Sequence, residues 1–276
     1  MNNVVVRSIS GVVFILAMLA CLMFNKFLFA GLIIFIMSVM LLEFYHITMG
    51  NSYTFSKVLA IIAAIFLFGL LFATASYHIP IRFVAFAMVP IFIVMINSLY
   101  VKDKDEYGIF SNIYTGLLYI AVPIALSNLI AFDKAGNFSG NLLLCFFIII
   151  WCSDVGAFAF GISLGKIFPQ KLFPSVSPKK TWIGFIGGLV SSVLAAFALY
   201  EFGILKFPLI HCLILSFIMS VTGVYGDLFE SQWKRVYGVK DSGKIIPGHG
   251  GFLDRFDSTL MAMPFGAIYL AIFDLL

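Results

Sequence analysis

Charged residues are scarce in this sequence. They make up 11% of its 276 residues, whereas hydrophobic residues make up 62% and the mean hydropathy is +1.08. Soluble domains carry about 25% charged and about 45–50% apolar residues, and a soluble fold of this size cannot bury so much apolar surface. The composition therefore excludes an ordinary soluble domain and indicates an integral membrane protein.

The sequence also has few cysteines. The four cysteines at positions 21, 145, 152 and 212 lie in apolar runs without Cys-x-x-Cys spacing, which favours reduced packing residues over a disulfide framework or a zinc site. There is no internal repeat and no low-complexity linker. The apolar stretch after Arg7 is followed by a second one almost at once, so we expect a retained first helix and not a cleaved signal peptide.

Apolar runs long enough to cross a bilayer follow one another along the chain. They do not alternate every second residue, which argues against membrane strands. They cover residues 9–24, 27–44, 58–76, 81–99, 113–131, 141–162, 182–203, 207–226 and 258–276. We therefore expect an all-α, polytopic membrane domain with about nine transmembrane helices and a polar cavity facing the cytoplasm. Residues 1–150 are predicted to be a scaffold, and residues 151–276 a catalytic region, because the polar chemistry gathers there.

The distribution of Lys and Arg predicts the orientation. With nine spans, thirteen basic residues lie on the side of the N-terminus and four on the other, so the positive-inside rule places the N-terminal side in the cytoplasm. This inference depends on the loops at 163–181 and 227–257. Without them the two sides tie, with Arg7, Lys57, Lys102 and Lys104 against Lys26, Arg82, Lys134 and Lys206.

One segment contradicts the general scarcity of charge. Ten charged residues, a third of the total, lie between Asp227 and Asp257, with apolar runs on both sides. Charge is costly near a bilayer, so such an island more often reflects chemistry than packing. Carboxylates bind hard cations, and lysine and arginine bind phosphates. The island therefore favours a membrane enzyme that handles a metal-bound nucleotide.

Two polar segments of the sequence precede the charged island. Asp154 lies inside the apolar run 141–162, where it either hydrogen-bonds to neighbouring helices or lines a polar cavity. Further on, Ser177 and Pro178 suit the N-cap and first position of a helix. Lys179 and Lys180 would then join free backbone N–H groups in an anion site, although lysines beside a membrane also mark topology or contact lipid headgroups.

The island itself divides into a helical part and a loop. If the preceding helix continues past the membrane, Asp227, Ser231 and Lys234 share one face, with Glu230 beside them. A salt-bridged helix end is the alternative interpretation of this cluster. The segment from Pro247 to Gly251 cannot be regular helix, because its glycines favour sharp turns or close approach to a ligand. Asp254 and Asp257 then open the last helix.

Three stretches of this sequence are similar to a known family. The run SQWKRVYGVKDSGKIIPGHGGFLDRFD at 231–257 resembles the signature of phosphatidate cytidylyltransferases, also called CDP-diacylglycerol synthases. SPKKTW at 177–182 and WCSDVGAFAFG at 151–161 resemble the same family. The resemblance is close in the C-terminal half and rests on hydropathy alone in the N-terminal half. Trp233 departs from the smaller apolar residue usual there, and we expect this to affect packing only.

The resemblance implies the reaction of CTP with phosphatidate to give CDP-diacylglycerol and pyrophosphate, with Mg²⁺ as cofactor. The lipid phosphate is its own nucleophile, so no Ser or Cys nucleophile is needed. Two cation sites that bridge the phosphates would reduce the repulsion between the anions, and positioning and charge stabilisation would provide most of the rate. The identity of a second cation is open, as is the cytosine pocket, for which Ser153, Ser177 and Ser231 are candidates.

The scheme and the family pattern together give a set of candidate residues. The predicted catalytic residues are Asp227, Asp254, Lys179 and His249, the last as a hydrogen-bond donor to pyrophosphate or as a loop anchor. The predicted substrate-binding residues are Lys179, Lys180, Ser177, Ser231, Lys234, Arg235, Lys244 and Arg255. The predicted metal ligands or their supporting partners are Asp227, Asp254, Asp257, Asp154 and Asp241.

Two other functions fit part of the pattern. A CTP-dependent polyprenol-type lipid kinase would transfer the γ-phosphoryl group and release CDP in place of pyrophosphate. A transporter would also have many spans and an intramembrane acid, but transport sites lie near the midplane between repeats, and here the polar residues gather at one face. The expected partners are CTP, phosphatidate and membrane lipid, with no nucleic acid. The GxxxG spacing of Gly161/Gly165 and Gly184/Gly188 is compatible with helix packing within the chain or in a homodimer.

Overall fold

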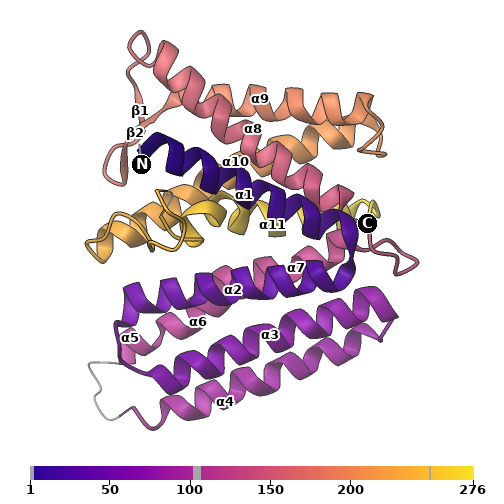
Figure 1. Cartoon of the computed structure of the whole chain (residues 1–276), viewed down its shortest axis with the longest axis vertical. Helices are drawn as coiled ribbons and strands as arrows, with labels where there is room; N and C mark the ends of the chain where they lie inside the picture. Colours follow the sequence, from indigo (N-terminus) through magenta and orange to yellow (C-terminus); the bar gives the residue numbers. More distant parts are fainter. Residues whose placement is uncertain (1–2, 102–106, 249) are drawn as a thin grey trace. The chain divides into compact units, whose positions relative to one another are not determined.

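The computed structural model describes residues 3–101, 107–248 and 250–276 (Figure 1). Lys102 and Lys104 of the orientation argument, and the candidate His249, lie outside the described residues. The chain forms two compact units. The first combines residues 1–139 with 239–255, and the second combines 140–238 with 256–276. The charged loop after residue 238 thus groups with the N-terminal helices, and not with the rest of the C-terminal half.

The first unit is a group of helices. In chain order they are α1 (Asn3–Phe24), α2 (Lys26–Met49), α3 (Thr54–Tyr77), the 3-10 helix η1 (Ile81–Ala87), α4 (Met88–Ser98), α5 (Tyr107–Phe110), α6 (Asn112–Gly116), the π-helical turn η2 (Leu117–Ala121) and α7 (Val122–Ala131). The second helix packs against α1, α3 and α6, and α3 also packs against α4 and α7. Apolar residues on nearly every turn of α2 and α3 fit this arrangement, because these two helices each contact several others.

Tyr45 shows how tightly this unit is packed. Its ring is fully buried, and its hydroxyl donates to the carbonyl oxygen of Ile113 at 3.0 Å. Gly116 lies against the same ring, where a Cβ atom would clash with it. A buried hydroxyl needs such a partner, so this bond fixes α2 against α6.

The second unit contains α8 (Asn141–Leu164), β1 (Lys171–Phe173), β2 (Ser177–Thr181), α9 (Trp182–Glu201) and α10 (Leu209–Val236), together with most of α11 (Leu253–Ile272). Helices α8 and α9 run side by side (Figure 1). Their glycines make this close contact: the Cα atom of Gly161 lies 3.6 Å from the position of a Cβ atom on Gly184. The glycine spacing is thus used for packing within the chain.

The segment around Ser177 corrects one expectation. Ser177 does not cap a helix, and Pro178 does not open one. Ser177–Thr181 is strand β2, which pairs antiparallel with β1 through Lys171 with Thr181 and Phe173 with Ser177. The N-cap of α9 is Thr181, whose hydroxyl accepts from the backbone N–H of Gly184 at 3.2 Å. The pairing of β1 with β2 uses the backbone that the predicted first helical turn required.

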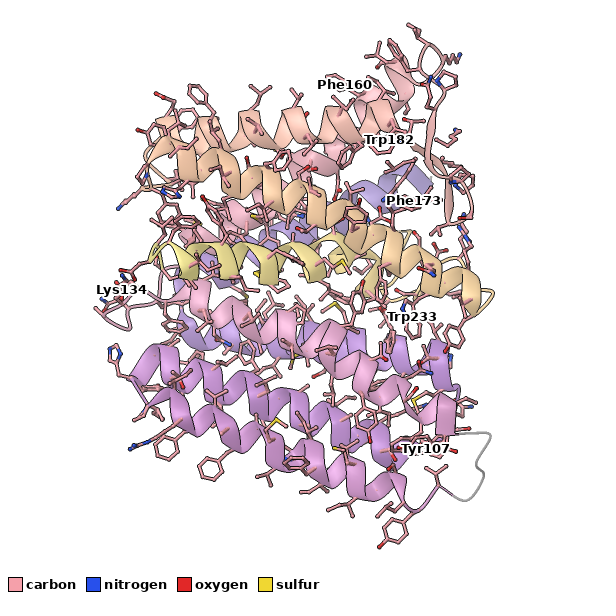
Figure 2. All side chains as sticks on the ribbon, turned by 180° about the vertical axis from the view of Figure 1, so that it is seen from behind. Tyr107, Lys134, Phe160, Phe173, Trp182 and Trp233 are labelled. Carbon is pink, nitrogen blue, oxygen red and sulfur yellow. The ribbon has the colours of Figure 1, made fainter. Side chains whose placement is uncertain are left out.

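The membrane-spanning character is confirmed. Among the described residues, seven stretches are long and apolar enough to cross a membrane: Lys26–Met49, Thr54–Tyr77, Ile81–Ser98, Tyr107–Ala131, Asn141–Leu164, Trp182–Glu201 and Leu209–Val236. The predicted spans 9–24 and 258–276 are also helical, but the apolar part of α1 is shorter, Ser10–Phe24, and α11 opens with charged residues. Large apolar side chains such as Leu118 and Phe158 are exposed, and side chains project all along the helices in Figure 2, as expected for surfaces that face lipid.

Candidate active site

Three carboxylates of the second unit act electrostatically on a fourth. Asp227 and Glu230 lie on α10, Asp154 on α8 and Asp257 near the start of α11. The charges of the other three all act on Asp257. We call these four residues the acidic cluster. Helix α10 reaches the cluster because it continues past the predicted span 207–226 to Val236. It approaches α11 closely because Gly226 lies against the carbonyl oxygen of Asp257, where a Cβ atom would clash.

Asp227 contacts two side chains that are not carboxylates. Lys180, from β2, places its Nζ atom 2.6 Å from Oδ2 of Asp227, and Ser231, one turn further along α10, donates to Oδ1 at 3.2 Å. The predicted sharing of a face by Asp227 and Ser231 is therefore confirmed. Because β2 is a strand, neighbouring side chains point to opposite faces. Lys180 is half-buried towards the carboxylate, whereas Lys179 is exposed.

The third residue of the predicted face, Lys234, pairs elsewhere. Its ammonium group forms a salt bridge with Glu230, four residues earlier on α10. Glu230 is buried, with 1% of its surface exposed. This part of α10 is thus a salt-bridged helix end, as the alternative interpretation held. Breaking a buried ion pair is costly because it leaves a charge without compensation. Lys234 therefore holds the Glu230 side chain in place.

Asp257 precedes the apolar part of α11. Burial raises the pKa of its carboxyl group well above the ordinary value, and the negative charges of Asp227, Glu230 and Asp154 raise this pKa further. Like charges that share a site disfavour ionisation, whereas a nearby cation favours it. Asp257 therefore belongs to a site with an excess of negative charge.

The residues of the acidic cluster fit a divalent cation by charge. Four carboxylates face two ammonium groups, those of Lys180 and Lys234, so negative charge predominates, and carboxylate oxygens are the ligands that Mg²⁺ prefers. Within the described part of the chain, however, no three Asp, Glu, His or Cys side chains lie close enough together to hold a metal ion.

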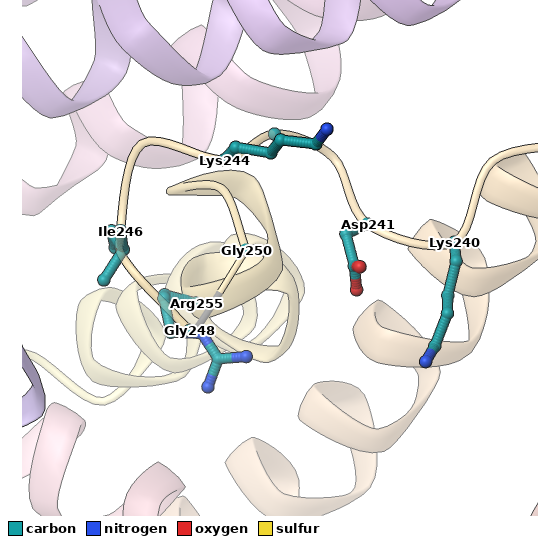
Figure 3. Close-up of a pocket in the computed structure, with 8 residues that line it drawn as sticks. Lys240, Asp241, Lys244, Ile246, Gly248, Gly250 and Arg255 are labelled. Carbon is teal, nitrogen blue, oxygen red and sulfur yellow. The ribbon is translucent and has the colours of Figure 1, made fainter. Parts of the chain in front are cut away.

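The first unit carries a pocket of about 670 Å³ in the charged loop. We call it the loop pocket; it is lined by Lys240, Asp241, Gly243, Lys244, Ile246, Gly248, Gly250 and Arg255. In Figure 3 the side chains of Lys240, Asp241 and Arg255 point to the same side of the loop. Gly248 and Gly250 have φ angles of +76° and +84°, which glycine adopts readily. Three cationic side chains against one carboxylate suit an anionic ligand.

Asp254 holds this loop together. Its Oδ2 atom accepts hydrogen bonds from the backbone N–H groups of Ser242 and Gly251, both at 2.8 Å, and lies 2.9 Å from the hydroxyl oxygen of Ser242. Carboxylates that accept several backbone hydrogen bonds are held in one orientation. Asp254 therefore has a structural task in the loop, in addition to the predicted role as a metal ligand.

The other predicted residues lie in varied surroundings. Ser177 is half-buried at the start of β2, and Arg235 is exposed in the last turn of α10. Ser153 is buried, and its hydroxyl lies 2.7 Å from that of Ser220, so it packs between α8 and α10. Lys244, Arg255 and Asp241 line the loop pocket.

Sequence reasoning missed two residues of the first unit, Glu43 and Ser242. Glu43 lies on α2 and accepts hydrogen bonds from the backbone N–H groups of Phe252 and Leu253 at 3.1 and 2.9 Å. Ser242 joins it to Asp254. The signal for Glu43 was available, because it is the one acid in the apolar run 26–49, the same feature that identified Asp154.

The sequence of this chain is similar to those of known proteins. The model of the Cytidylyltransferase family matches residues 5–273. A protein of Bacillus subtilis named phosphatidate cytidylyltransferase is 41% identical over 182 residues, which cover 65% of this chain and 63% of that protein. Proteins of the same name from Staphylococcus saprophyticus and Staphylococcus aureus are 45% and 46% identical over 124 residues, 45% of this chain and 46% of theirs.

The match thus spans somewhat less than two thirds of the Bacillus protein and about half of the staphylococcal ones. The family model covers nearly all of the chain. The protein belongs to the cytidylyltransferase family.

Proposed function

We propose that this protein transfers the cytidylyl group of CTP to phosphatidate and so forms CDP-diacylglycerol and pyrophosphate. The observation that carries the proposal is the acidic cluster with its two lysines, in a membrane chain that matches the cytidylyltransferase family from residue 5 to residue 273. The relatives named phosphatidate cytidylyltransferase support the choice of substrate. The product would serve phospholipid biosynthesis.

The reaction joins two anions. A phosphate oxygen of phosphatidate attacks the α-phosphorus of CTP and forms the new P–O bond. The bond from the α-phosphorus to the bridging oxygen breaks, and pyrophosphate leaves with the electron pair. Because much of the lipid phosphate is dianionic near neutral pH, no strong general base is required. The protein must instead hold the anions together and stabilise the departing charge.

The loop pocket supplies cations for this purpose. Lys240, Lys244 and Arg255 line the pocket, whose volume of about 670 Å³ is in the range of nucleotide-sized ligands. Arginine binds phosphate through two parallel hydrogen bonds and lysine as a point charge. We assign the triphosphate to these residues, and the released pyrophosphate to the same cations.

Mg²⁺ is the proposed cofactor. It would supply Lewis-acid stabilisation of the phosphate oxygens, held by Asp227 and Asp257 of the acidic cluster, with Asp154 as a supporting partner. Asp254 and Asp241 remain proposed ligands of a second cation. Among this chain's own residues, Ser231 orients the Asp227 carboxylate by donating to it, and Lys180 neutralises this carboxylate.

We also propose the cell membrane as the location, with the active site on the cytoplasmic side where CTP is available. The basic residues of the loops at 163–181 and 227–257 support this orientation by the positive-inside rule. A homodimer stays a proposal, since the glycine spacing that suggested it already packs α8 against α9.

The test is to identify the products. Purified protein is incubated with phosphatidate, Mg²⁺ and CTP labelled at either the α- or the γ-phosphorus. We expect the α-label in a lipid and the γ-label in pyrophosphate. A CTP-dependent lipid kinase would place the γ-label in the lipid and release labelled CDP, and this outcome would overturn the proposal.

The two lysines of β2 give a second test. Lys180→Ala should lower kcat/KM for CTP by about 10- to 100-fold, the usual loss for a residue that orients a metal ligand, because Asp227 loses its partner. Lys179→Ala is the comparison, since it removes the other predicted phosphate-binding lysine, which is exposed and should cause a smaller loss. Steady-state kinetics of both variants measure the loss in kcat/KM for CTP. Equal losses in the two variants would contradict the assignment of Lys180.

A further inference from the structure

Glu43 is a buried acid that lies far along the chain from the charged residues of the loop pocket. It lies in the apolar helix α2, and 6% of its surface is exposed. Its Oε1 atom accepts from the N–H of Phe252, and its Oε2 atom accepts from the N–H of Leu253. A buried carboxylate is unfavourable unless hydrogen bonds compensate for the lost water. Here the N–H of Phe252, the residue before α11, and the N–H of Leu253, the first residue of α11, provide that compensation.

These N–H groups have no partners within their own helix, because the first turn of any helix leaves its donors unsatisfied. They are usually capped by a nearby side chain in the sequence. In α11 the cap comes from Glu43, more than 200 residues earlier in the chain. The negative charge also matches the positive end of the helix dipole.

Ser242 connects Glu43 to the loop. Its hydroxyl oxygen lies 3.2 Å from Oε2 of Glu43 and 2.9 Å from Oδ2 of Asp254. Two glycines complete the contact: a Cβ atom on Gly243 or on Gly251 would clash with the Glu43 carboxylate. The loop backbone therefore lies directly on the carboxylate, and its path depends on where Glu43 is.

Other contacts with the N-terminal helices hold the same loop. The hydroxyl of Ser10 donates to the carbonyl oxygen of Pro247 at 3.0 Å. The ring of Phe252 lies edge-on to Phe14 and Phe35, with centroid distances of 6.3 and 6.0 Å. These contacts are apolar or neutral, and Glu43 contributes the charge among them.

From this network we propose that Glu43 is a positioning residue for the loop pocket. It does not line the pocket; it fixes the backbone of Ser242, Gly251 and the first turn of α11, between which Lys244 and Arg255 are presented to the ligand. The N-terminal helices thereby take part in phosphate recognition and are more than a membrane scaffold. The inference rests on the proposed function for its kinetic test, but not for its structural one.

The test compares Glu43→Gln with Glu43→Asp and with Glu201→Gln. Glutamine has the shape of glutamate, but its NH₂ group would face backbone N–H donors. We expect Glu43→Gln to raise the KM for CTP by about 10- to 100-fold with kcat much less affected, since the reacting groups stay in place. Glu43→Asp should fall between wild type and Glu43→Gln. Glu201→Gln, at an exposed glutamate that ends α9, should behave as wild type.

Hydrogen–deuterium exchange supplies a readout that does not need the reaction. Peptides containing Phe252 and Leu253 should exchange at least about tenfold faster in Glu43→Gln than in wild type, because their N–H groups lose their acceptors. Peptides from α8 should be unchanged. If Glu43→Gln does not fold, Ser242→Ala should show the same change in weaker form.

Unchanged exchange at Phe252 and Leu253, or a fall in kcat with KM unaltered, would overturn the role of Glu43. Absence of CDP-lipid product from the wild-type protein would instead overturn the proposed function. In that case the exchange experiment still decides whether Glu43 anchors the loop.

Discussion

Replacement of Asp227 by asparagine should lower kcat for CDP-lipid formation by about 100- to 1000-fold, the range found when one preorganised electrostatic group is lost from an active site. Asp227 accepts from Ser231 and pairs with Lys180, and it is one of the charges that act on Asp257. Asparagine keeps the size of the side chain and removes its charge. Lys180 would then lose its counterion, and the proposed cation would lose a ligand. Steady-state kinetics with labelled CTP measure the effect.

The matched control is Asp133→Asn. Asp133 is exposed in the turn between α7 and α8, so the same chemical change at this surface position should leave kcat within about twofold. Near-normal turnover in purified, folded Asp227→Asn would remove Asp227 from the mechanism.

Asp254→Asn is expected to have an effect of similar size, about 100-fold or more on kcat/KM. The structure adds a way to separate charge from loop geometry. Asparagine retains one carbonyl oxygen that can accept from Ser242 and Gly251 in place of Oδ2, so the loop should keep its path. Asp254→Ala leaves both N–H groups without an acceptor, which costs about 1–3 kcal/mol for each buried group.

The two variants therefore predict different behaviour. Asp254→Asn should lose activity with near-normal thermal stability, whereas Asp254→Ala should lose both. The measurements are kcat/KM for CTP and the unfolding midpoint of the purified protein in detergent. If Asp254→Asn retained wild-type activity, Asp254 would be only a structural residue of the loop.

The helices of this protein could be predicted from sequence because the apolar runs are long and continuous. The predicted span 141–162 corresponds to α8, Asn141–Leu164, and the span 182–203 to α9, Trp182–Glu201. Such runs must form helices in a membrane, since every backbone group has to be paired within its own segment. The extension of α10 to Val236 meets the condition under which Asp227 and Ser231 share one helix face.

Local polar structure was harder to predict. Ser177 and Pro178 carry a helix-start signal, yet they form strand β2. The competing interaction is the pairing of β2 with β1, and three-residue strands such as Lys171–Phe173 carry almost no periodicity of their own. The sequence alone therefore does not distinguish Lys179 from Lys180, whereas the strand places them on opposite faces.

The remaining features that the sequence alone does not predict are contacts between distant parts of the chain. Lys234 is a predicted phosphate ligand and also forms a salt bridge with Glu230, and Glu43, within the predicted scaffold, accepts from the first backbone N–H of α11. The predicted boundary between scaffold and catalytic region lies at residue 150, and the compact units group residues 239–255 with the N-terminal helices. No pattern within a single segment reports these pairings.

The central claim is that the acidic cluster binds the cation that accompanies the nucleotide. The most direct measurement is Mn²⁺ binding followed by electron paramagnetic resonance, with wild-type protein and Asp227→Asn, in the presence and absence of CTP. The account predicts that CTP strengthens Mn²⁺ binding to the wild type, and that Asp227→Asn weakens it by about 10- to 100-fold. Equal Mn²⁺ affinity in the two proteins, with and without CTP, would contradict it.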